Sequence, residues 1–318
     1  MADPRKLAPI LVVGSINMDM VAHCPHIPAP GETILGSALS LHPGGKGANG
    51  AAAAARLIHA TGGRRVIMLG AVGRDDNGVR GRRNLHERGV TVEHLLTVDD
   101  TPSGVALIAL AKSGENSIIV VPGANYSLRP EHVDAVFTLV APSVVLMQME
   151  IPLQTVARVA QLGRQAGVRV LLDPAPASRA LPDGLLAAVD VLMPNEGELA
   201  ALTGLPTETD EEAVRAAATL RAEGVGIVVV KRGERGALVV DDRGVRSIPS
   251  PVVAAVDTTG AGDCFDGALA VALGERQALD AAIIFATHAA ALACTRVGAQ
   301  EAQPTRTEVE QLLRSTEG

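Results

Sequence analysis

The sequence predicts an α/β protein: a Rossmann-like three-layer α/β/α sandwich with a mostly parallel central sheet and a small β-sheet lid. Three observations lead to this fold class. Short apolar runs rich in β-branched residues alternate with Ala-rich helical patterns along most of the 318 residues. The runs are apolar at every position, which is typical of strands buried on both faces of a parallel sheet. Two other stretches alternate with period 2 between Pro and Gly turns, which indicates a separate small sheet.

The main domain is predicted to comprise residues 1–16, 41–96 and 122–318. We expect its strands at residues 10–14, 66–70, 143–149, 168–173, 189–193 and 227–231. We expect its helices at residues 48–60, 153–166, 196–203, 211–223, 262–273 and 279–294. Ligands of open α/β sheets bind outside the carboxyl ends of the strands, so the segments that follow the strands are the first place to look for a site.

The lid is predicted to comprise residues 17–40 and 97–121. Within it, residues 105–110 and 117–121 flank the turn Lys-Ser-Gly-Glu-Asn, a pattern typical of a β-hairpin. Both lid segments lie next to strands of the main sheet in the chain. We therefore expect a small sheet that covers a ligand.

The composition argues against several functions. The chain has no Trp, one Tyr and three Phe, so recognition by stacking of bases on aromatic rings is not expected. Its net charge of −7 argues against a nucleic-acid partner. None of the three cysteines forms a C-x-x-C pair, which argues against a zinc site. The apolar run at residues 10–13 is too short for a signal peptide or a membrane span, so we expect a cytoplasmic protein without membrane contact.

The segment D-T-T-G-A-G-D at residues 257–263 precedes a predicted helix and carries the strongest chemical signal. Gly260 and Gly262 permit a tight turn and close approach of a ligand. The unpaired N–H groups at a helix start, together with the helix dipole, favour bound anions such as phosphoryl oxygens. Asp263 is suited to accept a proton from an attacking hydroxyl. The alternative is that Asp263 only caps the helix.

Two glycine-containing segments nearer the N-terminus predict a site for a polar small molecule. The sequence G-G-K-G-A-N-G at residues 44–50 does not follow a strand directly, so a dinucleotide loop is disfavoured. We interpret it as a helix start that presents Lys46 and Asn49; the alternative is a plain turn and cap. Asn17 and Asp19 alternate on an extended segment, point to one side and are suited to two vicinal hydroxyls. The alternative there is an Asx-turn at the strand end.

Two carboxylates follow other predicted strands. Asn195 and Glu198 are spaced i, i+3 in P-N-E-G-E and share a helix face, from which they could orient Mg²⁺ waters and nucleotide phosphates. Glu150 follows the strand at residues 143–149. Either glutamate alone could equally be a solvated or capping residue.

Taken together, these segments resemble the ribokinase/PfkB family of carbohydrate kinases over residues 8–312. The resemblance rests on G-S-I-N-M-D at 14–19, P-A-P-G-E-T at 28–33, G-G-K-G-A-N at 44–49, D-P-A-P-A at 173–177, P-N-E-G-E at 194–198, D-T-T-G-A-G-D-C-F at 257–265 and T-R-V-G-A-Q at 295–300, in the family's order. It implies the ribokinase-like fold and ATP-dependent phosphorylation of D-ribose at O5, because G-G-K-G-A-N favours ribose over the family's other acceptors. The alternatives are a kinase of the same fold for a nucleoside, deoxyribose, fructose or ketodeoxygluconate, and a non-catalytic sugar-binding regulator.

The resemblance also implies roles for individual residues. Asp263 would be the catalytic base, with Gly260, Ala261 and Gly262 as the anion hole. The sugar would be held by Asn17, Asp19, Gly45, Lys46, Asn49, Glu150 and Asp263. ATP and Mg²⁺ would be served by Asn195, Glu198, Lys231, Gly233, Gly236 and Thr287. A monovalent cation, K⁺, would bind Asp257 and the carbonyls of Thr259, Ala293, Arg296 and Gly298.

The sequence departs from the family's pattern at several places, including Thr287, where relatives often have Asn or His beside adenine, and Asn77, where they usually have Phe. Many relatives have Thr or Ser where Lys231 stands, and a lysine there could contact nucleotide phosphate. Ala302 stands where a Ser hydroxyl commonly faces the cation.

His288, next to Thr287, is interpreted as a packed helix histidine because the sequence offers it no partner. The family often dimerises through its lid, which implies a homodimer.

Overall fold

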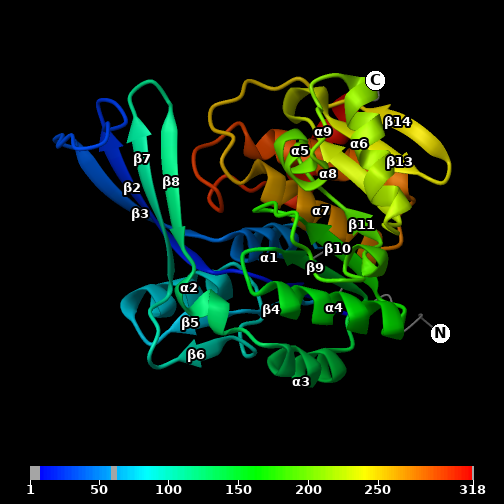
Figure 1. Ribbon diagram of the computed structural model, residues 1–318, viewed down its shortest axis with the longest axis horizontal. Coiled ribbons are helices and arrows are strands. Elements are labelled where there is room, and N and C mark those ends of the chain that lie inside the picture. The colour runs from blue at the N-terminus through cyan, green and yellow to red at the C-terminus, as the bar shows by residue number, and fades with distance from the viewer. Residues whose placement is uncertain (1–7, 59–62, 317–318) are drawn as a thin grey trace.

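The central element of the molecule is an eight-stranded sheet. We describe a computed structural model of the chain, which covers residues 8–58 and 63–316. The strands lie in the order β14-β13-β12-β11-β10-β9-β1-β4 and are parallel except for β13 and β14 at one edge (Figure 1). Their bounds are β1 (Ile10–Val13), β4 (Val66–Leu69), β9 (Val144–Gln148), β10 (Arg169–Asp173), β11 (Val191–Leu192), β12 (Ile227–Lys231), β13 (Ala237–Asp241) and β14 (Gly244–Ile248).

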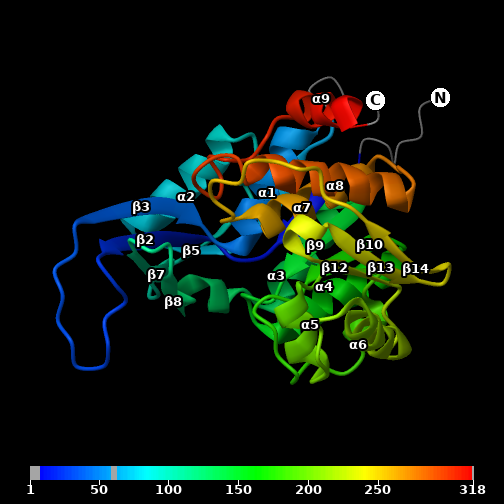
Figure 2. The ribbon, with the colours of Figure 1, turned by 90° about the horizontal axis from the view of Figure 1, so that it is seen from above.

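Helices cover both faces of this sheet and complete a three-layer sandwich (Figure 2). One layer holds α1 (Lys46–Leu57), α2 (Asp76–Glu87), α7 (Ala261–Gly274), α8 (Leu279–Ala293) and α9 (Arg306–Thr316). The opposite layer holds α3 (Pro130–Val140), α4 (Leu153–Ala166), α5 (Glu196–Thr203) and α6 (Asp210–Ala222). Each layer forms its own apolar core against one face of the strands. The α/β fold class predicted from the sequence is confirmed.

The buried strands explain why the apolar runs lack alternation. Every residue of β1, β4 and β9 is buried, because side chains on both faces pack under helices. On the first face, α1 and α7 lie against each other through small residues, of which Ala51 and Ala268 are wholly buried. This close packing brings the first turns of both helices to the same end of the sheet, beside the carboxyl ends of the parallel strands.

A second, four-stranded sheet projects from this end of the molecule to the left in Figure 1. It is ordered β3-β2-β7-β8, with bounds β2 (Asn17–Cys24), β3 (Ala38–Gly44), β7 (Gly104–Ala111) and β8 (Asn116–Val121). The predicted hairpin is the antiparallel pair β7 and β8. Every residue of the edge strand β8 is exposed, including the apolar Ile118 and Ile119.

Several elements differ from the predicted bounds. Helix α1 starts at Lys46, two residues early, because Gly45 supplies its cap; residues 59–60 of the predicted helix lie outside the described residues. Strand β11 has two residues because only these pair with β10 and β12. Strand β3 continues to Gly44, past residue 40, because it pairs with β2 over that length. Strand β6 (Leu96–Val98) pairs with β5 (Ala71–Gly73) and not with the projecting sheet. The remaining short helical segments are η2 (Gly123–Ser127), η3 (Leu186–Ala188) and η4 (Gly233–Arg235).

Candidate active site

The first turn of α7 forms the centre of the candidate site. Gly260 precedes the helix at φ 73, and a Cβ there would lie 2.9 Å from the Cα of Ala299, so only glycine fits this turn. Asp263 lies in the first turn and is 6% exposed. It does not cap the helix: the cap has no side-chain hydrogen bond, and the Asp263 carboxylate is directed toward α1. The alternative that this aspartate serves only as a cap is therefore wrong.

The N–H groups at this helix start are not equivalent. The N–H of Ala261 donates to the carbonyl of Thr258 at 3.2 Å, so it is already used. Within residues 8–58 and 63–316, the N–H of Gly262 has no protein acceptor. Of the three residues predicted to form an anion hole, Gly262 therefore offers an available donor, and Ala261 is engaged in the preceding turn.

Asp263 is held by a chain of amide groups. Asn49 on α1 donates from Nδ2 to Oδ2 of Asp263 at 2.8 Å. The Oδ1 atom of Asn49 accepts a hydrogen bond from Nε2 of Gln300 at 2.9 Å, and Oε1 of Gln300 accepts from Nδ2 of Asn84 at 2.5 Å. Gln303 donates to the backbone carbonyl of Asn49 at 2.8 Å. Because these partners occupy both ends of the Asn49 amide, it must present its NH₂ group to Asp263.

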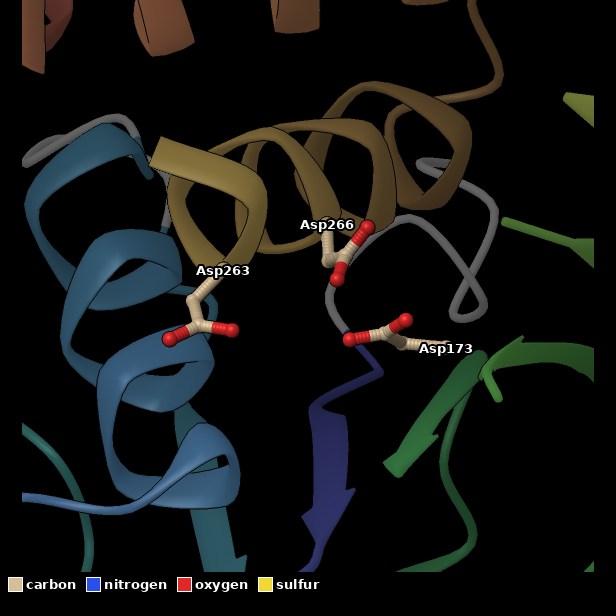
Figure 3. Close-up of side chains that lie close together, drawn as sticks. All are labelled: Asp173, Asp263 and Asp266. Carbon is tan, nitrogen blue, oxygen red and sulfur yellow. The ribbon is translucent and has the colours of Figure 1, made fainter. Parts of the chain in front are cut away.

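Charged side chains continue from Asp263 across the floor of the site. Nζ of Lys46 lies 3.6 Å from Asp263 and 3.6 Å from Asp173, at the end of β10. Nζ of Lys231, at the end of β12, lies 3.3 Å from Asp173 and 3.2 Å from Asp266. Figure 3 shows Asp263 and Asp266 projecting from α7, with Asp266 turned toward Asp173. Oxygens of the three aspartates lie within 4.8 Å of one another, but two ammonium groups already pair with them, which disfavours a cation at this cluster.

Burial and mutual charge shift the pKa values in this cluster. Burial alone would lower the pKa of Lys46, but Asp263, Asp173 and Glu150 outweigh it, so the pKa is raised well above its ordinary value. The pKa of Lys231 is raised in the same way, because Asp173 and Asp266 outweigh its burial. Burial raises the pKa of Asp266. The two lysines lower the pKa of Asp173 in spite of its burial. Both lysines therefore stay cationic at neutral pH.

A second group of side chains lies where β1 leads into β2. Asn17 is 5% exposed, and its Oδ1 accepts a hydrogen bond from Nδ2 of Asn125 at 2.8 Å. Asp19 lies two residues on, and a Cβ at Gly44 would come within 2.2 Å of its carboxylate. Glu150 accepts a hydrogen bond from the hydroxyl of Ser15 at 2.5 Å.

Glu150 also contacts the start of α1, and both Glu150 and Asp19 have shifted pKa values. Glu150 accepts a second hydrogen bond from the backbone N–H of Lys46 at 3.3 Å. Gly45 precedes that helix at φ 92, where a Cβ would lie 2.7 Å from the backbone nitrogen of Asn17. Burial raises the pKa of Glu150. Burial, with the charges of Glu150, Asp263 and Glu301, raises the pKa of Asp19 to about 7. Buried carboxylates this close together destabilise the folded protein unless polar groups of a ligand hydrogen-bond to them.

Two adjoining cavities occupy the other side of Asp263. The smaller, about 300 Å³, is lined by Lys46, Asn195, Glu198, Lys231, Gly233, Gly260, Gly262 and Asp263. The larger, about 570 Å³, shares Lys231, Gly233 and Gly262 with it and continues between Pro251, Val252, Val253, Phe265 and Ala290. Gly236 and Thr287 line the larger cavity, and the Thr287 hydroxyl donates to the carbonyl of Ile283 at 2.8 Å. Polar groups gather in the small cavity and apolar groups in the large one.

Asn195 and Glu198 form a reciprocal capping box at the start of α5. Oδ1 of Asn195 accepts from the N–H of Glu198 at 2.8 Å, and Oε2 of Glu198 accepts from the N–H of Asn195 at 2.8 Å. The capping alternative is thus confirmed for Glu198, and Asn195, for which no such role was expected, caps the helix as well. Oε1 of Glu198 keeps no hydrogen-bond partner among the described residues, and the side chain lines the smaller cavity. Burial and the charge of Asp173 raise the pKa of Glu198.

The predicted cation residues come together in two adjacent loops. One carboxylate oxygen of Asp257 accepts from the N–H and hydroxyl of Thr259 at 2.9 and 2.7 Å, and the other accepts from the N–H of Gly298 at 2.9 Å. These hydrogen bonds lower the pKa of Asp257 in spite of its burial. The carbonyl of Ala293 accepts a long bond of 3.4 Å from the N–H of Arg296. Ala302 is wholly buried.

The structure adds residues that the sequence reasoning missed as site residues. Asp173 and Asp266 hold the lysines, Gln300 orients Asn49, and Asn125 holds Asn17. Asp173 and Gln300 fall in the segments D-P-A-P-A and T-R-V-G-A-Q, and Asp266 lies one helical turn after Asp263. Motif membership and helical spacing could therefore have indicated that these three residues belong to the site. The histidine next to Thr287, His288, is packed between α8 and α9 as predicted, with Nε2 3.1 Å from the hydroxyl of Thr316.

A buried carboxylate beside a helix start, with lysines and a two-part cavity at the strand ends, defines the architecture of a phosphotransferase site. The model of the pfkB family carbohydrate kinases matches residues 8–306. A Bacillus subtilis ribokinase is 41% identical over 96% of this chain and 99% of its own, and a Salmonella typhi deoxyribokinase is 36% identical over 96% and 98%. The solved Arabidopsis thaliana ribokinase, complexed with ribose and ATP, superimposes with a TM-score of 0.88 at 35% identity, covering 96% of this chain and 99% of its own.

The chain therefore belongs to the PfkB family of carbohydrate kinases. The eight-stranded sheet with its separate small sheet matches the ribokinase structures, which confirms the resemblance drawn from the motifs. Among the helices that the structure describes, none is both long and apolar enough to cross a membrane.

Proposed function

We propose that this protein transfers the γ-phosphoryl group of ATP to the O5 hydroxyl of D-ribose. The observation that carries the proposal is the position of Asp263, which is buried and oriented by Asn49 in the cavity that contains the free N–H of Gly262. A base and an anion-binding group must lie on either side of a transferring phosphoryl group, and this pair fits that need. The ribokinase relatives support ribose, and the deoxyribokinase relative makes 2-deoxyribose the second candidate.

In the proposed reaction, Asp263 accepts the proton of the sugar hydroxyl while the oxygen attacks the γ-phosphorus. The bond between that phosphorus and the bridging oxygen breaks, and its electron pair leaves with ADP. The N–H of Gly262, the helix dipole of α7 and the ammonium of Lys46 stabilise the charge on the phosphoryl oxygens. The small sheet closes over the sugar and excludes water, which is the competing acceptor.

We expect the sugar to bind in a pocket at the start of β2, formed by Asn17, Asp19, Glu150 and Asn49. Carboxylate and amide groups suit the hydroxyls of a small sugar, and their mutual repulsion at Asp19 is relieved when hydroxyl groups donate to them. Lys46 and the backbone at Gly45 would complete this pocket.

ATP would extend from the smaller cavity into the larger one, with the base among the apolar side chains near Ala290 and Thr287. Gly233, Gly236 and Lys231 border the phosphates. Mg²⁺ would be held by the free carboxylate oxygen of Glu198 through water, since hard cations prefer oxygen ligands and Mg²⁺ keeps several waters. When bound with ATP, Mg²⁺ would neutralise charge on the phosphate oxygens.

A monovalent cation and a dimer complete the proposal. The carboxylate of Asp257 and the carbonyls of Thr259, Ala293, Arg296 and Gly298 offer the all-oxygen environment that suits K⁺. The exposed apolar strand β8 is an unpaired sheet edge, which favours association with a second copy through the lid.

The test is a phosphorylation panel of ribose, 2-deoxyribose, fructose and a nucleoside, each with ATP and Mg²⁺ and followed by ADP release. We expect the highest kcat/KM with ribose. Asp263→Asn is expected to lower kcat by at least about 100-fold, because an amide cannot accept the proton. Asp241→Asn, on strand β13 next to the edge strand β14, serves as the matched control. Near-normal turnover by Asp263→Asn would contradict the mechanism, and preference for another acceptor would contradict the substrate.

A further inference from the structure

Five charged side chains form one continuous array beneath the two cavities. Their order is Asp263, Lys46, Asp173, Lys231 and Asp266, and successive nitrogen and oxygen atoms lie 3.2–3.6 Å apart. Only Asp173 contacts both lysines. It lies at the carboxyl end of β10 near the middle of the sheet and is wholly buried.

Asp173 is unusual because neither of its carboxylate oxygens has a hydrogen-bond partner in the described structure. Its charge is compensated mainly by the two ammonium groups, at 3.3 Å from Lys231 and 3.6 Å from Lys46. Replacing a buried ion network by apolar residues of similar volume is often neutral or stabilising, so stability alone does not account for such a residue. Buried, strongly perturbed charges in a cleft are more typical of functional sites.

The two lysines that Asp173 holds both line the smaller cavity beside Asp263. Lys46 begins α1, and its backbone N–H donates to Glu150 on the sugar side. Lys231 lines both cavities on the nucleotide side. Its Nζ would lie 3.6 Å from a Cβ at Gly262, next to the free N–H of the α7 start.

We propose that Asp173 is a positioning residue that holds the ammonium groups of Lys46 and Lys231 in the cavity beside Asp263, along the path of the transferring phosphoryl group. The inference rests on the proposed function. Two ammonium groups at one site repel each other, and the shared carboxylate between them removes that repulsion and fixes both positions. Asp266 holds Lys231 from its other side. The triphosphate oxygens then compete with Asp173 for the ammonium of Lys231, so binding of ATP is weakened while the lysines stay aligned for transfer.

This arrangement predicts an unusual separation of kcat from ATP binding in Asp173→Asn. We expect kcat to fall about 100-fold, the order of loss for misplaced catalytic groups. The dissociation constant for MgATP, measured by calorimetry without sugar, is expected to stay the same or decrease, because a carboxylate that competes with the phosphates has been removed. Asp241→Asn, which alters a half-buried ion-pair carboxylate on β13, is the control and should change neither quantity.

Other results would overturn the proposal. A kcat of Asp173→Asn within threefold of the wild-type value means that the carboxylate positions nothing. A fall in kcat together with MgATP binding at least tenfold weaker means general damage to the site. If wild-type protein phosphorylates no sugar, the proposed function fails separately, and MgATP binding of Asp173→Asn alone decides the inference: unchanged or tighter binding keeps it, and weaker binding rejects it.

A second variant covers the case in which Asp173→Asn does not fold, since removing one partner of a buried ion pair is strongly destabilising. The double variant Asp173→Asn/Lys231→Met removes one negative and one positive charge and keeps the array balanced. We expect its kcat to be at least about tenfold lower than that of Lys231→Met, because Lys46 has also lost its ion pair with Asp173. Equal turnover of these two variants would overturn the proposal.

Discussion

Replacing Asp19 by asparagine is expected to stabilise the protein at alkaline pH while it weakens sugar binding. Burial and the neighbouring charges of Glu150, Asp263 and Glu301 raise the pKa of Asp19 from 3.8 to about 7. The folded protein therefore holds this proton more tightly than the unfolded chain does. The free energy of unfolding must then decrease as pH rises from about 4 to about 7, and it stays low above that range. Asparagine carries no charge at any pH and avoids this loss.

The size of the effect follows from the pKa difference. Each pH unit corresponds to about 1.4 kcal/mol, so a rise from 3.8 to about 7 gives an upper limit of about 4 kcal/mol at pH 8. Most of this loss of unfolding free energy in the wild type develops between pH 5 and pH 8. Over that range we expect the stability of Asp19→Asn relative to the wild type to increase by about 2 kcal/mol. When a bound sugar donates hydroxyl hydrogen bonds to the Asp19 carboxylate, the wild type gains stability relative to Asp19→Asn, because a hydrogen bond to a charged group contributes about 1.5–3 kcal/mol.

The assay is thermal unfolding of both proteins from pH 5 to pH 8, with and without ribose. We expect the Tm advantage of Asp19→Asn to grow by at least about 3 °C over this range without ribose and to shrink when ribose is added. Asp241→Asn is the control, because Arg246 lowers the pKa of Asp241 to about 2 and its contribution is constant above pH 5. If the Tm difference between Asp19→Asn and the wild type is independent of pH, or grows toward pH 5, the pKa of Asp19 is not raised in the folded protein.

Three further predictions follow from the same structure. Gln300→Leu should lower kcat about tenfold, because the Asn49 amide loses the partner that orients it toward Asp263. Gln303→Leu keeps the hydrogen bond between Asn49 and Gln300 and should leave kcat near the wild-type value. Steady-state kinetics of the two variants test this prediction. Ile119→Glu on the exposed edge strand β8 should yield a monomer in sedimentation velocity, and Val245→Glu, at an exposed apolar position on β14, should not; an unchanged mass for both would count against dimerisation through the lid. Activity should be higher in K⁺ than in Na⁺ at equal ionic strength, and Asp257→Ala should abolish the difference; equal rates for the wild-type protein in both salts would exclude the cation site.

Local signals in the sequence were sufficient for most of the fold. The uniformly apolar runs predicted buried parallel strands, and Leu153–Ala166, Glu196–Thr203 and Ile227–Lys231 have the predicted bounds because periodicity and flanking turns fix such elements locally. The glycine-rich segments marked the starts of α1 and α7 for the same reason. The starts of α1 and β11 differ from the predicted bounds by two residues, and several other ends differ by one, since caps and strand partners determine them.

The fold class, the family and the motif residues around Asp263 can therefore be predicted from the sequence, because each depends on neighbours in the chain. Tertiary structure alone decided which distant side chains meet. Asn49 and Gln300 are 251 positions apart, and Lys231 and Asp266 are 35 apart on different elements. The pairing of Asp173 with both lysines depends on the order of the strands and on the packing of α1 against α7. No periodicity or spacing encodes these contacts, because they arise only when separate elements come together at one end of the sheet.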